Sequence, residues 1–173
     1  MSLANKPIID KATRLLEKAS YDVRRISHNM MPGILSKYGL FEAVAGIFDE
    51  IDGIDGLHTE LDITGDPMRF NENKEIMMYR VIQEMINNSL KHAEPKNIFL
   101  AMHVSTDKIA VKYRDNGKGF DVEEKMKLKS FGLNNIISRV KFLGGDLKIE
   151  SEVGNGVECS FEVPVRSAAN RTE

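Results

Sequence analysis

The stretch that decides the fold reads Glu84-Met-Ile-Asn-Asn88-Ser-Leu-Lys91-His92. This stretch is the C-terminal part of residues 73–92. The apolar side chains of that segment recur at helical spacing, at Ile76, Met77, Val81, Met85 and Leu90. On such a helix Glu84, Asn88 and Lys91 stand at positions i, i+4 and i+7, so they share one face that His92 adjoins. The sequence therefore predicts a helix with one apolar side and one strongly polar side.

The polar side has the chemistry of a site for a metal-bound phosphate. A Mg²⁺ ion held by nucleotide phosphates takes hard oxygen ligands, few of them from protein. The side-chain carbonyl of Asn88 can supply one, and Glu84 can position a water or act as a base. Lys91 and His92 can neutralise phosphate charge at the helix end. A polar helix face that is merely solvated explains this stretch equally well.

A second stretch, Asp115-Asn-Gly117-Lys-Gly119-Phe, follows a predicted strand. A carboxylate only accepts hydrogen bonds, so Asp115 at a strand end can accept the exocyclic amino proton of adenine. Gly117 and Gly119 let the backbone approach a ligand without a Cβ clash. Asp-Asn-Gly is also an ordinary turn signal. The order of the two stretches, helix first and then strand end, favours a Mg-nucleotide pocket over two unrelated features.

The remaining patterns predict alternating helices and strands. We expect helices near 40–52, 73–92 and 133–143, and strands near 57–63, 98–104, 109–113, 147–151 and 157–165. The last two strands should pair as a hairpin across Gly154-Asn-Gly156. Residues 121–130 are charged and lack periodicity, which predicts a mobile loop. Because each strand has one apolar face, we expect a mixed, mostly antiparallel sheet with helices on one side, a two-layer α/β sandwich.

Composition narrows the functional classes. The chain has 173 residues, 42% of them hydrophobic and 29% charged, which is ordinary for a globular protein of one domain plus an appendage. A net charge of −2 does not favour binding to nucleic acid. The single cysteine, Cys159, excludes an internal disulfide and suits a reducing compartment. We see neither a signal peptide nor a membrane-spanning run, and expect a cytoplasmic protein that meets a membrane only through a region upstream.

The N-terminal segment carries a heptad seam of apolar residues, formed by Ala12, Leu16, Ala19, Val23, Ile26 and Met30. Such a helix needs a partner, from another chain or from its own domain. Pro32-Gly33 ends it. We therefore expect a bundle helix over 1–31, a catalytic domain over 32–166 and a flexible tail over 167–173.

These motifs resemble the N, G1, G2 and G3 boxes of the ATP-binding domain of sensor histidine kinases, a domain with the GHKL ATPase fold. The matching residues are Glu84, Asn88, Lys91 and His92, then Asp115, Gly117, Gly119 and Phe120, then Gly132 and Leu133, then Gly154 and Gly156. Further stretches are similar to the nitrate-sensor-type subfamily: Arg24–Pro32, Gly39–Ala43, Tyr79–Glu84 and Gly132–Val140. The resemblance covers about residues 15–166. Val157 departs from it, since a Thr usually follows the second glycine.

The resemblance implies roles for these residues. Asn88 holds Mg²⁺ through ATP, Asp115 reads adenine, and Glu84 helps to organise the metal or a water. Lys91 and His92 approach the phosphates. The glycines of the boxes, together with Leu133, shape the pocket and its lid. Catalysis is then mostly positioning and charge neutralisation. The implied partners are ATP, a second copy of the chain in the full-length protein and the receiver domain of a response regulator.

His28 superficially resembles the phosphoacceptor of the commoner histidine kinases. An acceptor histidine benefits from an adjacent acid, and Asn29 follows here. We expect the acceptor to lie on a preceding helix that is absent, with 5–31 forming the second bundle helix. Two alternatives remain open: a degenerate domain that serves for docking or dimerisation, and another GHKL member such as an anti-sigma serine kinase or a gyrase-like ATPase.

Overall fold

A computed structural model describes residues 33–66, 68–127 and 131–165. The predicted bundle helix, His28 and the predicted tail lie outside the described residues. The described helices are α2 Gly33–Tyr38, α3 Leu40–Ile51, η2 Ile54–Gly56, α4 Glu72–Asn88, η3 Ser89–Ala93, α5 Val122–Lys127 and α6 Phe131–Phe142. The described strands are β1 His58–Gly65, β2 Asn97–Val104, β3 Lys108–Asp115, β4 Leu147–Ser151 and β5 Val157–Pro164.

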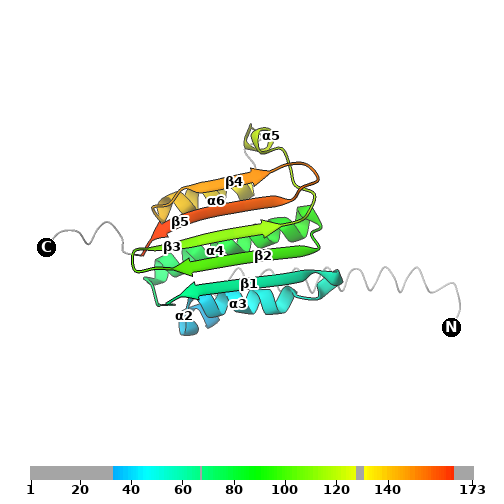
Figure 1. The fold of residues 1–173 in the computed structure, drawn as a ribbon. Helices are drawn as coiled ribbons and strands as arrows, with labels where there is room; N and C mark the ends of the chain where they lie inside the picture. Colours follow the sequence, from blue (N-terminus) through cyan, green and yellow to red (C-terminus); the bar gives the residue numbers. More distant parts are fainter. Residues whose placement is uncertain (1–32, 67, 128–130, 166–173) are drawn as a thin grey trace, which may run out of the picture.

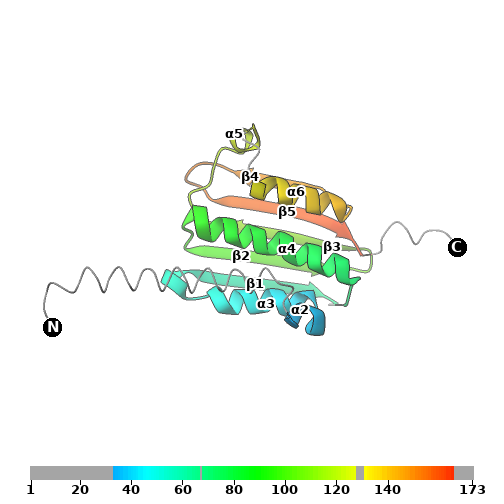
Figure 2. The same cartoon turned by 180° about the vertical axis from the view of Figure 1, so that it is seen from behind.

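The five described strands form one sheet in the order β1-β2-β3-β5-β4. β1 and β2 run parallel, whereas the other neighbouring pairs are antiparallel. Figures 1 and 2 show that α3, α4 and α6 lie side by side over one face of the sheet, while the described chain leaves the other face open. The predicted mixed, mostly antiparallel two-layer sandwich is confirmed.

Buried and more exposed residues alternate along the central strands β2 and β3, and this alternation separates the two faces of the sheet. In β2 the residues Ile98, Leu100 and Met102 are buried beneath the helices. On the open face, Lys108 of β3 pairs with Glu162 of β5 at 2.9 Å, and Lys112 pairs with Glu158 at 2.9 Å across the same two strands. The sheet therefore has one apolar side that forms the core and one solvated side, as an antiparallel sheet permits. α4 lies in the middle of the helical layer (Figure 2).

Two local features differ from the sequence-based expectations. The predicted loop over 121–130 is wrong for its first part, which forms the short helix α5. Asp121 caps this helix, because its Oδ1 accepts the backbone N–H of Glu124 at 2.9 Å. The predicted helix 73–92 does not stay α-helical to its end either: its last turn, η3, is a π-helix, a form often found at functional sites.

Candidate functional site

A buried carboxylate organises the site. Asp115 ends β3, and only 2% of its surface is exposed. Its Oδ2 accepts a 2.5 Å hydrogen bond from Ser89 Oγ, and its Oδ1 accepts a 2.9 Å bond from the backbone N–H of Gly117. Ser89 in turn accepts a 2.7 Å bond from the hydroxyl of Tyr113. Each carboxylate oxygen has a second lone pair, so Asp115 can still accept a hydrogen bond from a ligand.

The loop after Asp115 is tied to the elements on both of its sides. Asn116 Oδ1 accepts the backbone N–H groups of Lys96 and Asn97, at 2.9 and 2.8 Å. The N–H of Lys118 donates to the carbonyl of Ala93, at the end of η3, at 2.8 Å. The N–H of Phe120 donates to Ser151 Oγ on β4 at 2.9 Å. The loop is therefore held in place before any ligand arrives.

Two glycines allow the backbone of the loop and of the β4–β5 hairpin to lie close together. Gly119 has φ +59°, and a Cβ there would overlap the carbonyl oxygen of Glu152. Gly156 has φ +75°, and a Cβ there would overlap the carbonyl oxygen of Asp115 itself. Glycine is required at both positions, because a residue with a side chain rarely adopts this positive φ and because its Cβ would have no space. The glycines let the β4–β5 hairpin lie against the backbone of Asp115 and of the loop that follows it.

The acid and the amide of α4 point toward the start of α6. A Cβ on Gly132 would stand 2.8 Å from Glu84 Oε1 and 3.2 Å from Asn88 Oδ1. Both side chains are half-buried. Glu84 and Asn88, one turn apart on α4, thus present oxygen atoms to the same place, as their i, i+4 spacing predicts.

These groups surround a cavity of about 360 Å³, within the size range of small-molecule pockets. Its apolar wall includes Met85, Leu133, Ile136, Ile149 and Val157, and its polar groups include Asn88, Ser89, His92, Asp115 and Lys125. A flat base fits between such walls, with the acceptor Asp115 at its edge. The residues present therefore suit an adenine nucleotide.

The predicted site residues divide into two groups. Those that line the cavity are Asn88, His92, Asp115, Gly119, Gly132 and Leu133. Those outside its lining are Glu84, Lys91, Gly117, Gly154 and Gly156. Gly117 acts through its bond to Asp115, and Glu84 lies beside Asn88, whereas the side chain of Lys91 is exposed to solvent. Gly154 sits at the hairpin tip, where its N–H donates to the carbonyl of Lys118 at 2.6 Å.

Sequence reasoning missed Ser89, Tyr113 and Lys125 as members of the site. Tyr113 precedes Asp115 by two residues on one strand, so the strand period already placed both on the same face. Ser89 follows Asn88 directly and stands four residues after the buried Met85, so the helical period of α4 already placed it on the inward face. Lys125 is carried to the cavity by α5, which the sequence reasoning did not predict.

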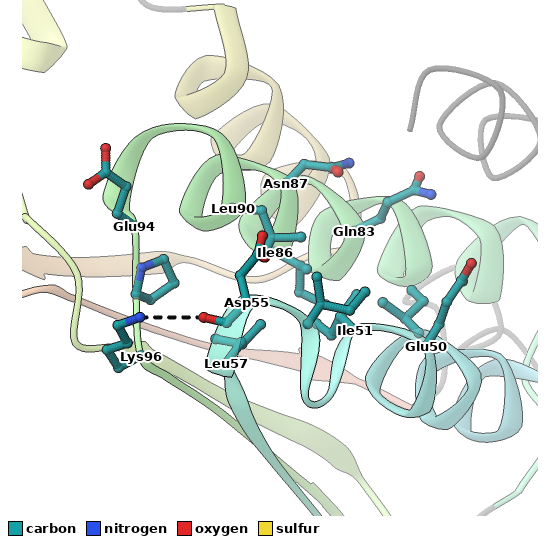
Figure 3. A pocket seen from close by; sticks show the side chains of 13 residues that line it. Glu50, Ile51, Asp55, Leu57, Gln83, Ile86, Asn87, Leu90, Glu94 and Lys96 are labelled. Carbon is teal, nitrogen blue, oxygen red and sulfur yellow. Dashed lines mark hydrogen bonds between the residues drawn. The ribbon is translucent and has the colours of Figure 1, made fainter. Parts of the chain in front are cut away.

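A larger hollow of about 540 Å³ lies between α3, η2 and the C-terminal half of α4 (Figure 3). Its acids Glu50, Asp55 and Glu94 are exposed, and Lys96 Nζ donates to the backbone carbonyl of Asp55 at 3.4 Å. It has apolar walls, but its acids are solvated and none is buried like Asp115. Chemistry therefore favours the smaller cavity as the nucleotide site.

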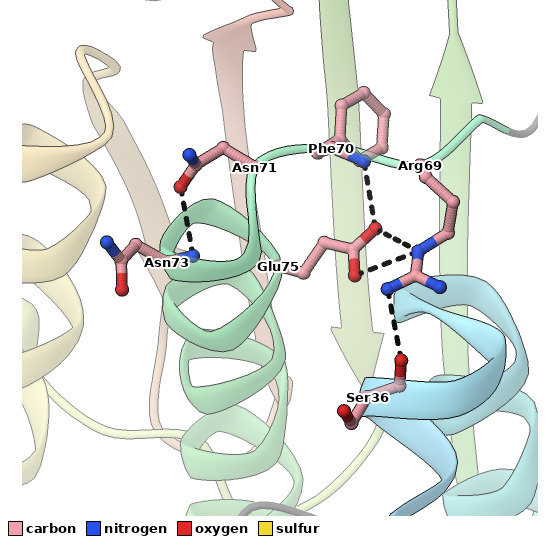
Figure 4. A network of polar contacts seen from close by, with 6 residues as sticks. All are labelled: Ser36, Arg69, Phe70, Asn71, Asn73 and Glu75. Atoms are coloured by element: carbon pink, nitrogen blue, oxygen red, sulfur yellow. Dashed lines mark hydrogen bonds and ion pairs between the residues drawn. The ribbon is translucent and has the colours of Figure 1, made fainter.

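The second buried acid of the described chain, Glu75, has a structural task. It lies near the start of α4, with 1% of its surface exposed. Its carboxylate accepts Arg69 Nε at 3.0 and 3.2 Å and the N–H of Phe70 at 2.9 Å, and Arg69 also donates to the carbonyl of Ser36 in α2 at 3.3 Å (Figure 4). This network ties α2 to α4 and lies at the end of α4 opposite to Asp115.

No helix of the described segments is long and apolar enough to cross a membrane. Within the same segments, no group of three or more His, Cys, Asp or Glu side chains could hold a metal ion. Cys159 is buried in the core, as the strand pattern predicts, and burial raises its pKa to about 12.

Two relatives of this chain carry the names of histidine kinases. The signal transduction histidine-protein kinase/phosphatase DegS of Brevibacillus brevis is 30% identical over 152 residues, which is 88% of this chain and 39% of the relative. The oxygen sensor histidine kinase NreB of Staphylococcus carnosus is 27% identical over 161 residues, 91% of this chain and 46% of the relative. The chain thus spans less than half the length of these two relatives.

Solved structures agree on the fold. The histidine kinase AdeS of Acinetobacter baumannii superposes with a TM-score of 0.58 at 15% identity, over 96% of this chain and 87% of that one. The histidine kinase domain of the Erythrobacter litoralis EL346 blue-light activated kinase gives 0.55 at 19% identity, over 70% of this chain and 59% of that one. The GHKL-type fold expected from the motifs is confirmed.

The family model described as histidine kinase-, DNA gyrase B-, and HSP90-like ATPase matches residues 73–167. This range contains the helix of Glu84 and Asn88, the strand end at Asp115 and both later glycine turns. This match covers more than half of the chain, and DegS is 30% identical over 88% of the chain, so the chain belongs to the histidine kinase-, DNA gyrase B-, and HSP90-like ATPase family.

Proposed function

We propose that this chain is the ATP-binding catalytic part of a sensor histidine kinase, which transfers the γ-phosphoryl group of ATP to a histidine of the intact protein. A response regulator receiver domain then takes the phosphoryl group. The observation that carries the proposal is the buried Asp115, whose two oxygens are held by Ser89 and Gly117 while it borders the cavity. Relatives named as histidine kinases, rather than gyrases or serine kinases, support this choice of activity.

Each polar residue of the site has a proposed task toward the nucleotide. Asp115 accepts the amino group of adenine, which rests between the apolar walls. Asn88 supplies a protein oxygen to a Mg²⁺ ion that bridges the phosphates, and Glu84 beside it orients a water. His92 lines the cavity wall, and the side chain of Lys91 is exposed to solvent beside it. Both are proposed to neutralise charge on the phosphate tail. When bound, Mg²⁺ neutralises phosphate charge, and the protein contributes mainly position.

The phosphoacceptor in this proposal is a histidine other than His28, on a helix that precedes the seam of the N-terminal segment. The intact protein is then a dimer whose bundle carries the acceptor. Incubation of this chain with γ-labelled ATP should consequently leave no stable label on it. Acid-labile label that disappears in His28→Gln would contradict the placement of the acceptor.

Calorimetric titration with a non-hydrolysable ATP analogue tests the nucleotide site. We expect binding that requires Mg²⁺ and that weakens at least about tenfold in Asp115→Asn. The side-chain amide of this variant places an N–H₂ donor among groups that are themselves donors, so polar groups are left unpaired. Asp62→Asn is the matched control, since Asp62 is an exposed aspartate on β1. Equal affinity in the two variants, or no binding by the wild type, would refute the proposed function.

A further inference from the structure

Three buried groups form a continuous hydrogen-bonded line along the wall of the cavity. Tyr113, Ser89 and Asp115 are 1%, 4% and 2% exposed. The hydroxyl of Tyr113 lies 2.7 Å from Ser89 Oγ, which lies 2.5 Å from Asp115 Oδ2. Tyr113 and Asp115 come from one face of β3, and Ser89 comes from the first residue of η3. The line therefore joins two rigid elements.

The direction of the line follows from proton counting. A carboxylate only accepts, and a serine hydroxyl has one proton to donate. Ser89 must therefore donate its hydrogen bond to Asp115, and the Ser89 oxygen accepts a hydrogen bond from the hydroxyl of Tyr113. Burial raises the pKa of the Tyr113 hydroxyl far above its ordinary value, so this donor keeps its proton. The polarity of the line runs one way, from Tyr113 to Asp115.

The consequence for Asp115 is a fixed orientation. Ser89 holds Oδ2 and the N–H of Gly117 holds Oδ1, so rotation of the carboxylate would break one of two hydrogen bonds. Its remaining lone pairs can only accept. A ligand edge placed against it must therefore carry a donor, and an edge that carries a carbonyl oxygen would set two acceptors against each other in a buried place.

We propose that Ser89 and Tyr113 are positioning residues that set base selectivity, so that the site takes a 6-amino purine and rejects a 6-oxo purine. This inference rests on the nucleotide-binding function proposed above. It assigns to the hydroxyl groups of Ser89 and Tyr113 a task that Asp115 alone cannot fulfil. A site built on satisfied buried groups discriminates more strongly than an apolar pocket does.

The test compares Mg²⁺-dependent binding of two non-hydrolysable triphosphate analogues, one with adenine and one with hypoxanthine, by calorimetry. For the wild type we expect at least about a hundredfold preference for adenine. In Ser89→Ala and in Tyr113→Phe the preference should fall at least about fivefold, chiefly through weaker adenine binding, because the carboxylate loses a charge-assisted bond or its support. Ser89→Thr retains a hydroxyl and should restore the preference.

Ser160→Ala is the matched control, because Ser160 faces the open side of the sheet on β5. Its preference should stay within about twofold of wild type, since it lacks contact with the cavity. A preference that is equally unchanged in both Ser89→Ala and Tyr113→Phe would overturn the inference and leave the proposed function intact. A change in Ser89→Ala alone would overturn the part assigned to Tyr113. A wild type that binds neither analogue would overturn the proposed function itself.

Discussion

The network of Arg69 and Glu75 (Figure 4) offers a quantitative test of how the helical layer is held together. In Arg69→Met the apolar stem remains, but the buried carboxylate of Glu75 keeps only the N–H of Phe70. Removing one partner of a fully buried ion pair costs about 3–5 kcal/mol. Because the side chain of Arg69 is 53% exposed, water screens part of the pair, and we expect about 2–3 kcal/mol.

Urea unfolding measures this cost. With a typical slope of about 2 kcal/mol per molar urea, the midpoint should fall by about 1–1.5 M. Lys108→Met is the control, because Lys108 and Glu162 also pair at 2.9 Å but on the exposed sheet face. Its midpoint should hardly move. A midpoint for Arg69→Met that matches the control would refute the reasoning that burial, rather than the ion pair itself, gives this contact its stabilising effect.

Two further predictions concern titration and a turn. Burial raises the pKa of Cys159 from 9.0 to about 12 and that of Tyr79 from 10.0 to about 12, so both groups ionise more easily in the unfolded chain. These two groups should therefore leave the free energy of unfolding unchanged between about pH 7 and 9 and lower it between pH 9 and 12, with a shallower fall in Tyr79→Phe; a rise over the alkaline range would contradict the assignment. Gly119→Ala should lose about 1–3 kcal/mol of stability and weaken binding of the ATP analogue, because its Cβ meets the carbonyl of Glu152, whereas Gly46→Ala, which has open space within α3, should keep both. Urea unfolding and calorimetry distinguish the two glycine variants, and equal losses would contradict the steric argument.

The layers of the fold could be predicted because their signals are local. Alternation along β2 and β3 predicted their positions to within two residues, and the spacing from Ile76 to Leu90 predicted a helix there, although not the π-form of its last turn. Asp115 could be assigned to the edge of a pocket because it ends a strand and precedes two glycines. These patterns depend on neighbours within one turn or one strand, which the sequence displays directly.

Features that depend on distant parts of the chain were not predictable in the same way. The insertion of β5 between β3 and β4 is set by pairing between residues some fifty positions apart, such as Tyr113 and Cys159. The π-form of the last helical turn was missed as well, because its hydrogen-bond pattern has no clear sequence signal. Lys91 was proposed for its charge and its spacing from Glu84, but its side chain is exposed to solvent, whereas Ser89 was left out although it stands four residues after the buried Met85.

The central claim, that nucleotide binds beside Asp115 and not in the larger hollow, is tested most directly by an NMR titration of the isotope-labelled chain. On addition of the Mg²⁺-bound ATP analogue we expect the largest amide shifts at Gly117, Gly119 and Gly132, which lie around the smaller cavity. The amides of Ile51 and Asp55, at the larger hollow, should hardly change. Shifts concentrated at Ile51 and Asp55 would contradict the account.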